Sequence, residues 1–341
     1  ITLADGAKKQ LTTSTVESYY PVDYVPGMSA LIYSADKGGN EIDHLYLLED
    51  NGKTTDLTPG ENNKVSFFKW SEDKKSMFYI SNIRDPKYFD VYKMNIGEWI
   101  PTLFYENKSG LDVNEISDDE KTLVVSKTVT TSENELYLVN KETGTQTELS
   151  LPDQKGRYGV SGISKDSKYV FYLTDGGKEF TYLVQYDMNS GERKVLYETN
   201  WDVMYTFLSE KETYRVIAIN EDGKNTIIMQ DAASGKTIDF PAIPDGDILG
   251  VEISDSEKLM RLSVGTSKAP NNIYLYNLET KELKKLTESL NKEINADDLV
   301  SAEVVRYKSF DGLDIPAIYY KPHQASPEQK VPALVWVHGG P

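Results

Sequence analysis

Hydrophobic and polar positions follow a pattern that repeats along most of the chain. Each copy has a polar turn, an apolar run, a second run, a turn glycine and a closing pair such as Leu57-Thr58. Short apolar runs bounded by turn residues predict β-strands. The second runs contain the pairs Leu45-Tyr46, Val91-Tyr92, Leu136-Tyr137, Gln185-Tyr186 and Ile273-Tyr274.

The polar turns recur at a regular interval. Their clearest copies begin at Ser71, Ser117, Ser164 and Ser254, with weaker copies at Val25 and Ser209, so the intervals are 46, 46, 47, 45 and 45 residues. A period of this size, with several short strands in each copy, is typical of β-propeller blades. The runs directly after the turns are interpreted as inner strands buried on both faces.

Turn glycines mark the outer part of each copy, where a hairpin needs positive φ. They are Gly52, Gly97, Gly144, Gly191 and Gly235. The sixth copy has Lys281 at this place, which predicts a different turn. Residues 1–12, with Gly6 and Leu11-Thr12, match only the outer half of a copy. The pattern therefore predicts a seven-bladed propeller whose first blade is incomplete in this chain.

The repeat stops after Leu286-Thr287, and the polar residues 288–298 suit a hinge or short helix. A strand over 302–309, a turn at Asp311-Gly312 and a strand over 313–320 are then expected. The apolar run 333–337 reads as a strand buried on both faces of an α/β sheet. We therefore expect a mainly-β chain, with a propeller over 1–289 and a hinge plus the start of a second domain with an α/β sheet over 290–341.

Charge and composition exclude several classes of protein. The net charge is −17, which opposes binding to nucleic-acid phosphates or anionic lipid, and no apolar run is long enough to span a membrane. No cysteine is available for disulfides or thiolate metal sites. The chain starts at Ile1 without a signal-peptide pattern. Cytoplasmic and exported locations both stay open, as does homo-oligomer formation.

Several short motifs in the repeats are interpreted as structural. Ser234-Gly235-Lys236-Thr237 lacks the first glycine of a phosphate-binding loop and falls at a blade turn. Gly159–Ile163 lacks the last glycine of a nucleophile elbow and is predicted to be a turn, and Asp118–Glu120 is predicted to be surface charge. His44, His323 and His338 lack metal-ligand spacing. Neither a metal nor a cofactor is expected.

The apolar run 333–337 leads into His338-Gly339-Gly340-Pro341. A strand that ends in His-Gly-Gly is how α/β-hydrolases build half of an oxyanion hole, since glycines let the backbone approach the substrate carbonyl. With the repeats before it, this segment resembles the prolyl oligopeptidase family of serine peptidases, in particular its acylaminoacyl-peptidase-like branch. The resemblance covers the whole chain and implies that residues 290–341 are a hinge and the truncated start of an α/β-hydrolase catalytic domain.

The resemblance implies a Ser-Asp-His hydrolase whose propeller restricts access to short peptides. It implies that the Gly340 N–H donates to the oxyanion, and that His338 stands where relatives carry an oxyanion tyrosine. The family order of the triad would place Ser, Asp and His after Pro341, so His338 would order the loop rather than act as general base. The chain alone is then expected to be inactive and to need a complementing C-terminal catalytic portion.

Three functions stay open at this point. Dipeptidyl peptidases of the family hold the substrate's amino end with paired glutamates, and Glu210 and Glu212 do not match that motif. We therefore favour an oligopeptidase or acyl-peptide hydrolase. A non-enzymatic propeller that binds proteins or peptides is the second hypothesis, and an esterase of the same fold is the third.

Overall fold

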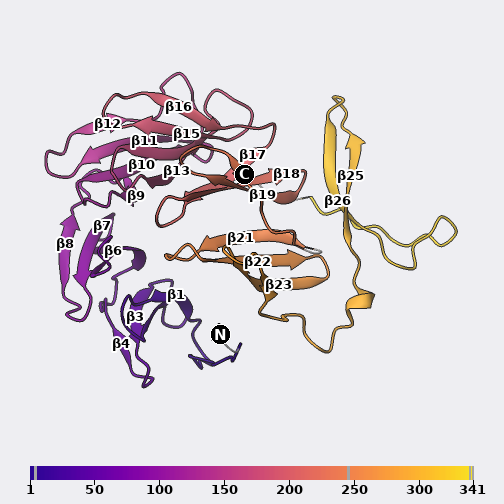
Figure 1. The fold of residues 1–341 in the computed structure, drawn as a ribbon, viewed down its shortest axis with the longest axis horizontal. Coiled ribbons are helices and arrows are strands. Elements are labelled where there is room, and N and C mark those ends of the chain that lie inside the picture. Colours follow the sequence, from indigo (N-terminus) through magenta and orange to yellow (C-terminus); the bar gives the residue numbers. More distant parts are fainter. Residues whose placement is uncertain (4–5, 244–245, 338, 340–341) are drawn as a thin grey trace. The chain divides into compact units, whose positions relative to one another are not determined.

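The computed structural model describes residues 1–3, 6–243, 246–337 and 339. The chain is mainly β, and its one described helix is the 3₁₀ turn η1 (Ala296–Asp298). Six four-stranded antiparallel sheets and a separate two-stranded sheet contain the 26 described strands (Figure 1). The chain divides into two compact units, residues 1–128 with 135–149, and residues 129–134 with 150–341.

The first unit contains two whole blades and most of a third. Their strands are ordered in space as in the sequence. Blade A has β1 (Tyr20–Tyr24), β2 (Leu31–Ala35), β3 (His44–Leu48) and β4 (Thr54–Asp56). Blade B has β5 (Val65–Trp70), β6 (Ser76–Asp85), β7 (Tyr88–Asn95) and β8 (Pro101–Tyr105). Blade C has β9 (Asp112–Ile116), β10 (Thr122–Thr130), β11 (Glu133–Asn140) and β12 (Gln146–Glu148).

The second unit contains the tip of the β10–β11 hairpin, three further blades and a hairpin near the C-terminal end. Blade D has β13 (Tyr158–Ile163), β14 (Tyr169–Thr174), β15 (Tyr182–Asp187) and β16 (Arg193–Tyr197). Blade E has β17 (Asp202–Leu208), β18 (Tyr214–Glu221), β19 (Lys224–Asp231) and β20 (Thr237–Ile238). Blade F has β21 (Asp247–Ile253), β22 (Leu259–Thr266), β23 (Ala269–Asn277) and β24 (Leu283–Lys285), and the hairpin has β25 (Ala302–Lys308) and β26 (Asp314–Tyr320).

The prediction of seven blades is wrong, because the described chain forms six. No strand lies before Tyr20 among the described residues. The match of residues 1–12 to a blade came from one turn: the Gly6 N–H donates to the Thr2 carbonyl and the Thr2 N–H to the Ala7 carbonyl. The Gly144 turn has the same two bonds: the Gly144 N–H donates to the Asn140 carbonyl and the Asn140 N–H donates to the Thr145 carbonyl. A turn alone does not make a blade, since no paired strands flank it.

The repeating polar turn joins the first and second strands of each blade. The runs that follow it are the second strands of the blades: Met77-Phe78-Tyr79, for example, is buried in β6, as expected for an inner strand. The first strand of each blade precedes the turn, was not predicted from the repeat, and carries a β-bulge against its partner, as between Phe67 and Lys69 or between Val203 and Tyr205. A bulge interrupts the two-residue alternation by which strands are found in a sequence.

The serine of each polar turn closes it from within. Ser164 is buried, its Oγ accepts the N–H of Tyr169 at 2.9 Å, and it donates to Asp166 at 2.7 Å. Ser71 and Ser117 make the equivalent bonds. The residue three positions after the serine has positive φ, such as Ser167 at 54°. These residues are structural, as the sequence indicated.

The outer turns are more uniform than the glycine pattern predicted. Lys281 has φ 64° and donates to the Asn277 carbonyl, as Gly191 does to Asp187 and Gly235 to Asp231. The prediction of a different turn at Lys281 is therefore wrong. The hydrogen bonds of the hairpin hold a lysine in a conformation that glycine adopts at lower cost.

The hydrophobic core lies between neighbouring blades. In the first unit, Ile32 and Leu45 of blade A pack with Met77 of blade B. In the second unit, Val216 and Met229 of blade E pack with Met260 of blade F. Apolar residues on both faces of each sheet are thereby buried, which explains the continuous apolar runs of the middle strands.

The expected opening of an α/β-hydrolase domain is absent from the described chain. Strands β25 and β26 form a two-stranded sheet of their own, without further strands. Residues 333–337 are irregular, and Leu334, Val335, Trp336 and Val337 are 83–86% exposed. An apolar strand is buried only when neighbouring strands and helices cover it, and none of the described elements does so here.

Candidate functional site

The predicted oxyanion segment is described at one residue only. Gly339 lies in exposed, irregular chain, and a side chain at its Cα would meet nothing within 4 Å. His338, Gly340 and Pro341 fall outside the described residues. The prediction that Gly340 donates to an oxyanion therefore stays a prediction.

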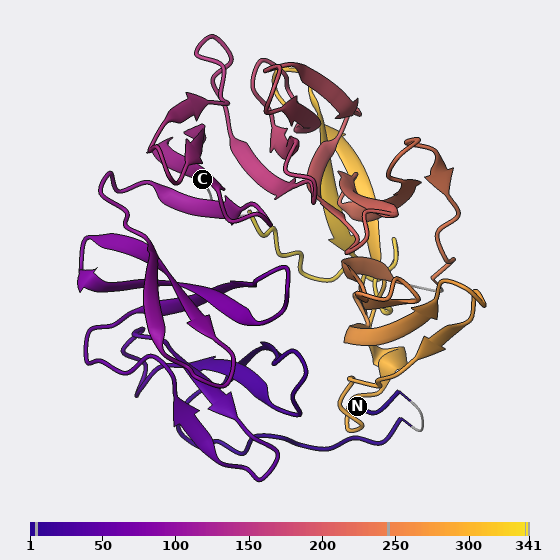
Figure 2. The ribbon, with the colours of Figure 1, turned by 60° about the vertical axis from the view of Figure 1, so that its left-hand side comes forward.

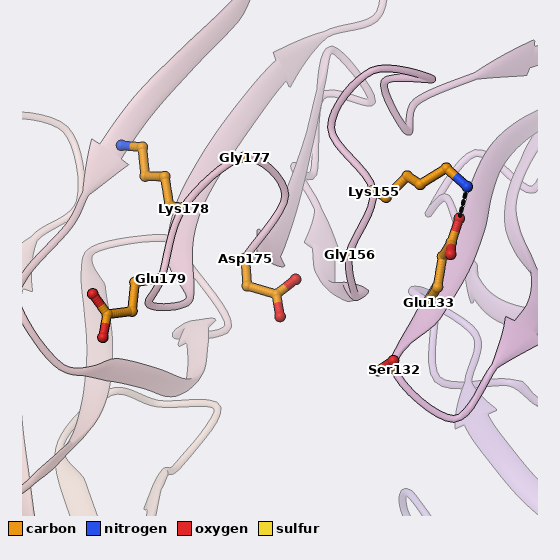
Figure 3. Close-up of a pocket in the computed structure, with 8 residues that line it drawn as sticks. All are labelled: Ser132, Glu133, Lys155, Gly156, Asp175, Gly177, Lys178 and Glu179. Carbon is orange, nitrogen blue, oxygen red and sulfur yellow. Dashed lines mark ion pairs between the residues drawn. The ribbon is translucent and has the colours of Figure 1, made fainter. Parts of the chain in front are cut away.

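A hollow of about 590 Å³ lies in the second unit (Figure 3). Three loops surround it: the tip of the β10–β11 hairpin, the connection into β13 and the β14–β15 loop. The residues that line it are Ser132, Glu133, Lys155, Gly156, Asp175, Gly177, Lys178 and Glu179. No sequence motif predicted a role for any of them, although Asp175-Gly176-Gly177 closely follows an apolar run and is a typical turn signal.

Close backbone contacts hold these loops together. A Cβ added at Gly156 would lie 2.2 Å from Asp175 Oδ1, and one at Gly176 would lie 2.7 Å from the Gln154 carbonyl. These two positions therefore need glycine for the close approach of the loops. The Tyr182 hydroxyl donates to the Gly176 carbonyl at 3.0 Å, which anchors the β14–β15 loop to the blade.

An asparagine joins the first loop to the second. The Asn134 side chain donates to the Tyr158 carbonyl at 2.9 Å and accepts the Tyr158 N–H at 2.7 Å. The Arg157 guanidinium donates to the Thr131 carbonyl at 2.8 Å. The hollow is thus built on hydrogen-bonded loops rather than on a gap between loose segments.

The charges around the hollow are largely paired. Lys155 Nζ lies 3.4 Å from Glu133 Oε1, as the dashed line in Figure 3 marks, and Lys178 pairs with Glu198. Lys178 also lies over the Tyr182 ring, 4.2 Å from its centre. The Asp175 carboxylate accepts the Arg157 N–H at 2.7 Å. These groups can contact polar or charged ligands, but no nucleophile stands next to a base among them.

No metal centre is found in the part of the chain that the structure describes, where no three His, Asp or Glu residues gather suitably. His44 has its Nδ1 2.8 Å from Asp56 Oδ2 and its Nε2 2.9 Å from the Gly60 carbonyl oxygen. Both ring nitrogens are therefore engaged, Nδ1 in joining β3 to β4 and Nε2 in joining β3 to the loop after β4. His323 is exposed in irregular chain.

The acidic residues that drew attention in the sequence connect neighbouring blades. Glu212 accepts the Lys165 N–H at 2.8 Å, and Glu210 lies 3.3 Å from Lys165 Nζ. Glu120 pairs with Lys93 at 2.6 Å. Each of these contacts joins adjacent blades, so these carboxylates serve packing between the blades.

Two further motifs have clear positions. Ser234–Thr237 spans the β19–β20 turn, where the Gly235 N–H donates to the Asp231 carbonyl, so its interpretation as a blade turn is confirmed. Gly159–Ile163 lies within β13, so the prediction of a turn there is wrong. The glycines of that segment lie in the first strand of blade D, on either side of its bulge. No helix among the described residues has the length and apolar character needed to cross a bilayer.

Comparison with known proteins gives the family. The model of the prolyl oligopeptidase N-terminal β-propeller domain matches residues 23–289. Dipeptidyl aminopeptidase BIII of Pseudoxanthomonas mexicana is 24% identical over 348 aligned positions, which cover 98% of this chain and 50% of that protein. The chain thus spans about half the length of this curated relative.

Solved structures show the same fold. A structure from a study of two prolyl endopeptidases has a TM-score of 0.69 at 18% identity and covers 89% of this chain and 47% of its own. Prolyl oligopeptidase B of Galerina marginata, bound to a 35-residue substrate, has a TM-score of 0.66 at 16% identity and covers 88% and 45%. With the family match over residues 23–289, the chain belongs to the prolyl oligopeptidase family, of which it carries the N-terminal β-propeller domain.

Proposed function

We propose that this chain is the substrate-gating propeller of a serine peptidase that hydrolyses short peptides, and that it is inactive by itself. The match of residues 23–289 to the family's propeller domain is the observation that carries the proposal. The charged groups of the described hollow support contact with polar ligands and lack a nucleophile–base pair. A catalytic portion following Pro341 would supply Ser, Asp and His, with Gly340 as one oxyanion donor.

An activity comparison tests this proposal. We expect the purified chain to show no peptide or ester hydrolysis and no labelling by an organophosphonate that traps active-site serines. The longer polypeptide that carries the sequence after Pro341 is expected to show both. Hydrolysis and labelling by the chain alone would contradict the proposal.

Substrate length tests the gating role. If the propeller restricts access, the longer polypeptide will cleave a short peptide much faster than the same sequence placed within an unfolded protein. Equal cleavage of the two substrates would contradict a gate. An organophosphonate-inhibited sample is the control for contaminating proteases.

The amino end of the substrate separates the branches of the family. The relative from Pseudoxanthomonas mexicana bears the name of a dipeptidyl aminopeptidase. In this chain Glu210 and Glu212 contact Lys165 of the neighbouring blade, which supports an oligopeptidase or acyl-peptide hydrolase instead. Peptides with free and acetylated amino ends, assayed side by side, will distinguish them: exclusive release of dipeptides from free amino ends would contradict this proposal.

A further inference from the structure

The tip of blade E is a two-residue turn with an unusual backbone. Asp222 and Gly223 join β18 to β19 directly, since Glu221 pairs with Lys224. Their φ values are 56° and 76°. Positive φ at both central residues is the type I′ geometry favoured in tight hairpins, for which Asp-Gly is a preferred sequence. Asn220 Oδ1 accepts the Gly223 N–H at 3.1 Å and braces the turn.

This turn contacts the β25–β26 hairpin, which lies beside blade E in both ribbon views (Figures 1 and 2). Asp222 Oδ1 lies 2.6 Å from Arg306 Nη2, and this oxygen is shielded from solvent. A Cβ at Gly223 would lie 3.1 Å from Ile318 Cδ1, so the glycine lets the turn approach β26 closely. At the tip of blade F, Ser267 Oγ accepts the Ala302 N–H at 3.0 Å.

The hairpin has little other support. Only Val304, Ile315 and Ala317 are partly buried among the residues of its two strands. Its strands pair with each other over their whole length, from Ala302 with Tyr320 to Lys308 with Asp314. An isolated two-stranded hairpin is at best marginally stable in water. Its order therefore depends on the few contacts that it makes with blades E and F.

We infer that the Asp222-Gly223 turn is an ionic latch that holds the β25–β26 hairpin against the β18–β19 end of blade E. The latch opens when the Asp222–Arg306 ion pair is removed, or when salt screens it. The functional meaning rests on the proposed function: the hairpin follows the propeller in the chain, so its release would change how a following catalytic portion is held.

Hydrogen–deuterium exchange of the whole chain tests the latch without any measurement of activity. Asp222→Asn and Arg306→Gln are each expected to raise the exchange rate of peptides covering 302–320 and of the blade E tip about three- to fivefold. In the unsubstituted chain, high salt should produce part of the same increase, and in both variants the salt effect should disappear. Combining the two substitutions should add little to either one alone.

A matched control uses an ion pair inside the hairpin. Lys308 Nζ lies 2.7 Å from Asp314 Oδ2 at the far end of the two strands. Lys308→Gln should change exchange near that end only and leave the blade E tip as it was. Arg306→Lys should restore part of the protection, whereas Gly223→Val should remove it by collision with Ile318 and by strain at positive φ.

Three results would overturn the inference. They are unchanged exchange in Asp222→Asn and Arg306→Gln, additive effects in the double variant, or an equal response of the blade E tip to Lys308→Gln. Protection of peptides from β18 and a constant far-ultraviolet circular dichroism spectrum will show that each variant is folded. None of these exchange measurements requires catalysis. The latch can therefore be refuted while the proposed peptidase function holds, and the peptidase function can be refuted while the latch holds.

Discussion

Arg215 is a buried cation without a described anionic partner at its guanidinium. The residue lies in β18 and is only 5% exposed. Its guanidinium carbon lies 4.4 Å from the centre of the Phe171 ring on the neighbouring blade D. No ion pair or side-chain hydrogen bond of Arg215 is found among the described residues. Burial lowers the pKa of Arg215 to about 10, although the charge of Glu212 acts in the opposite direction.

The pKa gives the size of the expected effect. This fall of the Arg215 pKa to about 10 corresponds to about 3 kcal/mol of unfavourable free energy for the charged form in the folded chain. The cation–π contact with Phe171 offsets about 1–2 kcal/mol of that cost. Arg215→Met keeps an unbranched apolar stem and removes the charge. We therefore expect it to raise the free energy of unfolding by about 1–2 kcal/mol.

Urea unfolding measured by tyrosine and tryptophan fluorescence checks this expectation. The midpoint should rise at constant slope. The sign with pH follows from the lowered pKa of a base: the cost is fully present below the folded pKa of about 10 and fades as the pH rises above it toward the higher pKa of the unfolded chain. The difference between the two proteins should therefore be constant between about pH 6 and 9.

Arg193 provides the matched control. Its guanidinium carbon lies 5.0 Å from the centre of the Tyr186 ring, but it is less buried than Arg215 and it hydrogen-bonds the Tyr172 side chain. Arg193→Met should therefore lower stability. If Arg215→Met also lowers it by more than about 1 kcal/mol at an unchanged slope, the reasoning from desolvation is refuted.

Three further substitutions test other parts of the fold. Asp90 is fully buried and accepts hydrogen bonds from the Arg84 guanidinium at 2.6 and 2.9 Å and from the Asn107 N–H at 2.7 Å. Asp90→Ala should therefore lower the free energy of unfolding by about 2–3 kcal/mol in urea melts. An unchanged urea midpoint would contradict this. Ser164→Ala, which removes the buried acceptor of the polar turn, should cost about 1–2 kcal/mol, whereas the exposed control Ser190→Ala should change stability by less than about 0.5 kcal/mol. Burial acts to raise the pKa of Glu257, but hydrogen bonds from Ser209, Thr213 and the Lys211 N–H outweigh it and lower the pKa below 4.5. The stability that the ionised Glu257 contributes to the folded chain is therefore present above pH 4.5 and lost as the pH falls through the folded pKa. Glu257→Gln should flatten the pH dependence of the urea midpoint in that window. An unchanged pH dependence would contradict this assignment.

The latch and the hollow could not be read from the sequence. Asp222-Gly223 is recognisable as a turn, but nothing local indicates that Arg306, more than eighty residues later, lies 2.6 Å from its carboxylate. Likewise Glu133, Lys155 and Asp175 come from three separate loops. Such groups meet only because segments far apart in the sequence pack against each other in the fold, which a one-dimensional pattern does not encode.

The sequence by itself determined the repeat, its period and the family. Strong local signals carry these features: a serine turn, an apolar middle strand and an outer turn with positive φ recur in every full blade or nearly so. Local hydrogen bonds form the turns, and burial on both faces selects the middle strands, so both leave a clear mark on the sequence.

Only the tertiary structure decided the blade count, the presence of a first strand before each polar turn and the state of residues 333–337. These first strands are bulged, which breaks the period-two pattern, and the Gly6 turn resembles a blade turn without paired strands beside it. The run 333–337 is apolar enough for a buried strand, yet Trp336 is 86% exposed. Burial depends on neighbouring elements as well as on a segment's own residues, and that is the physical reason why the sequence alone could not settle it.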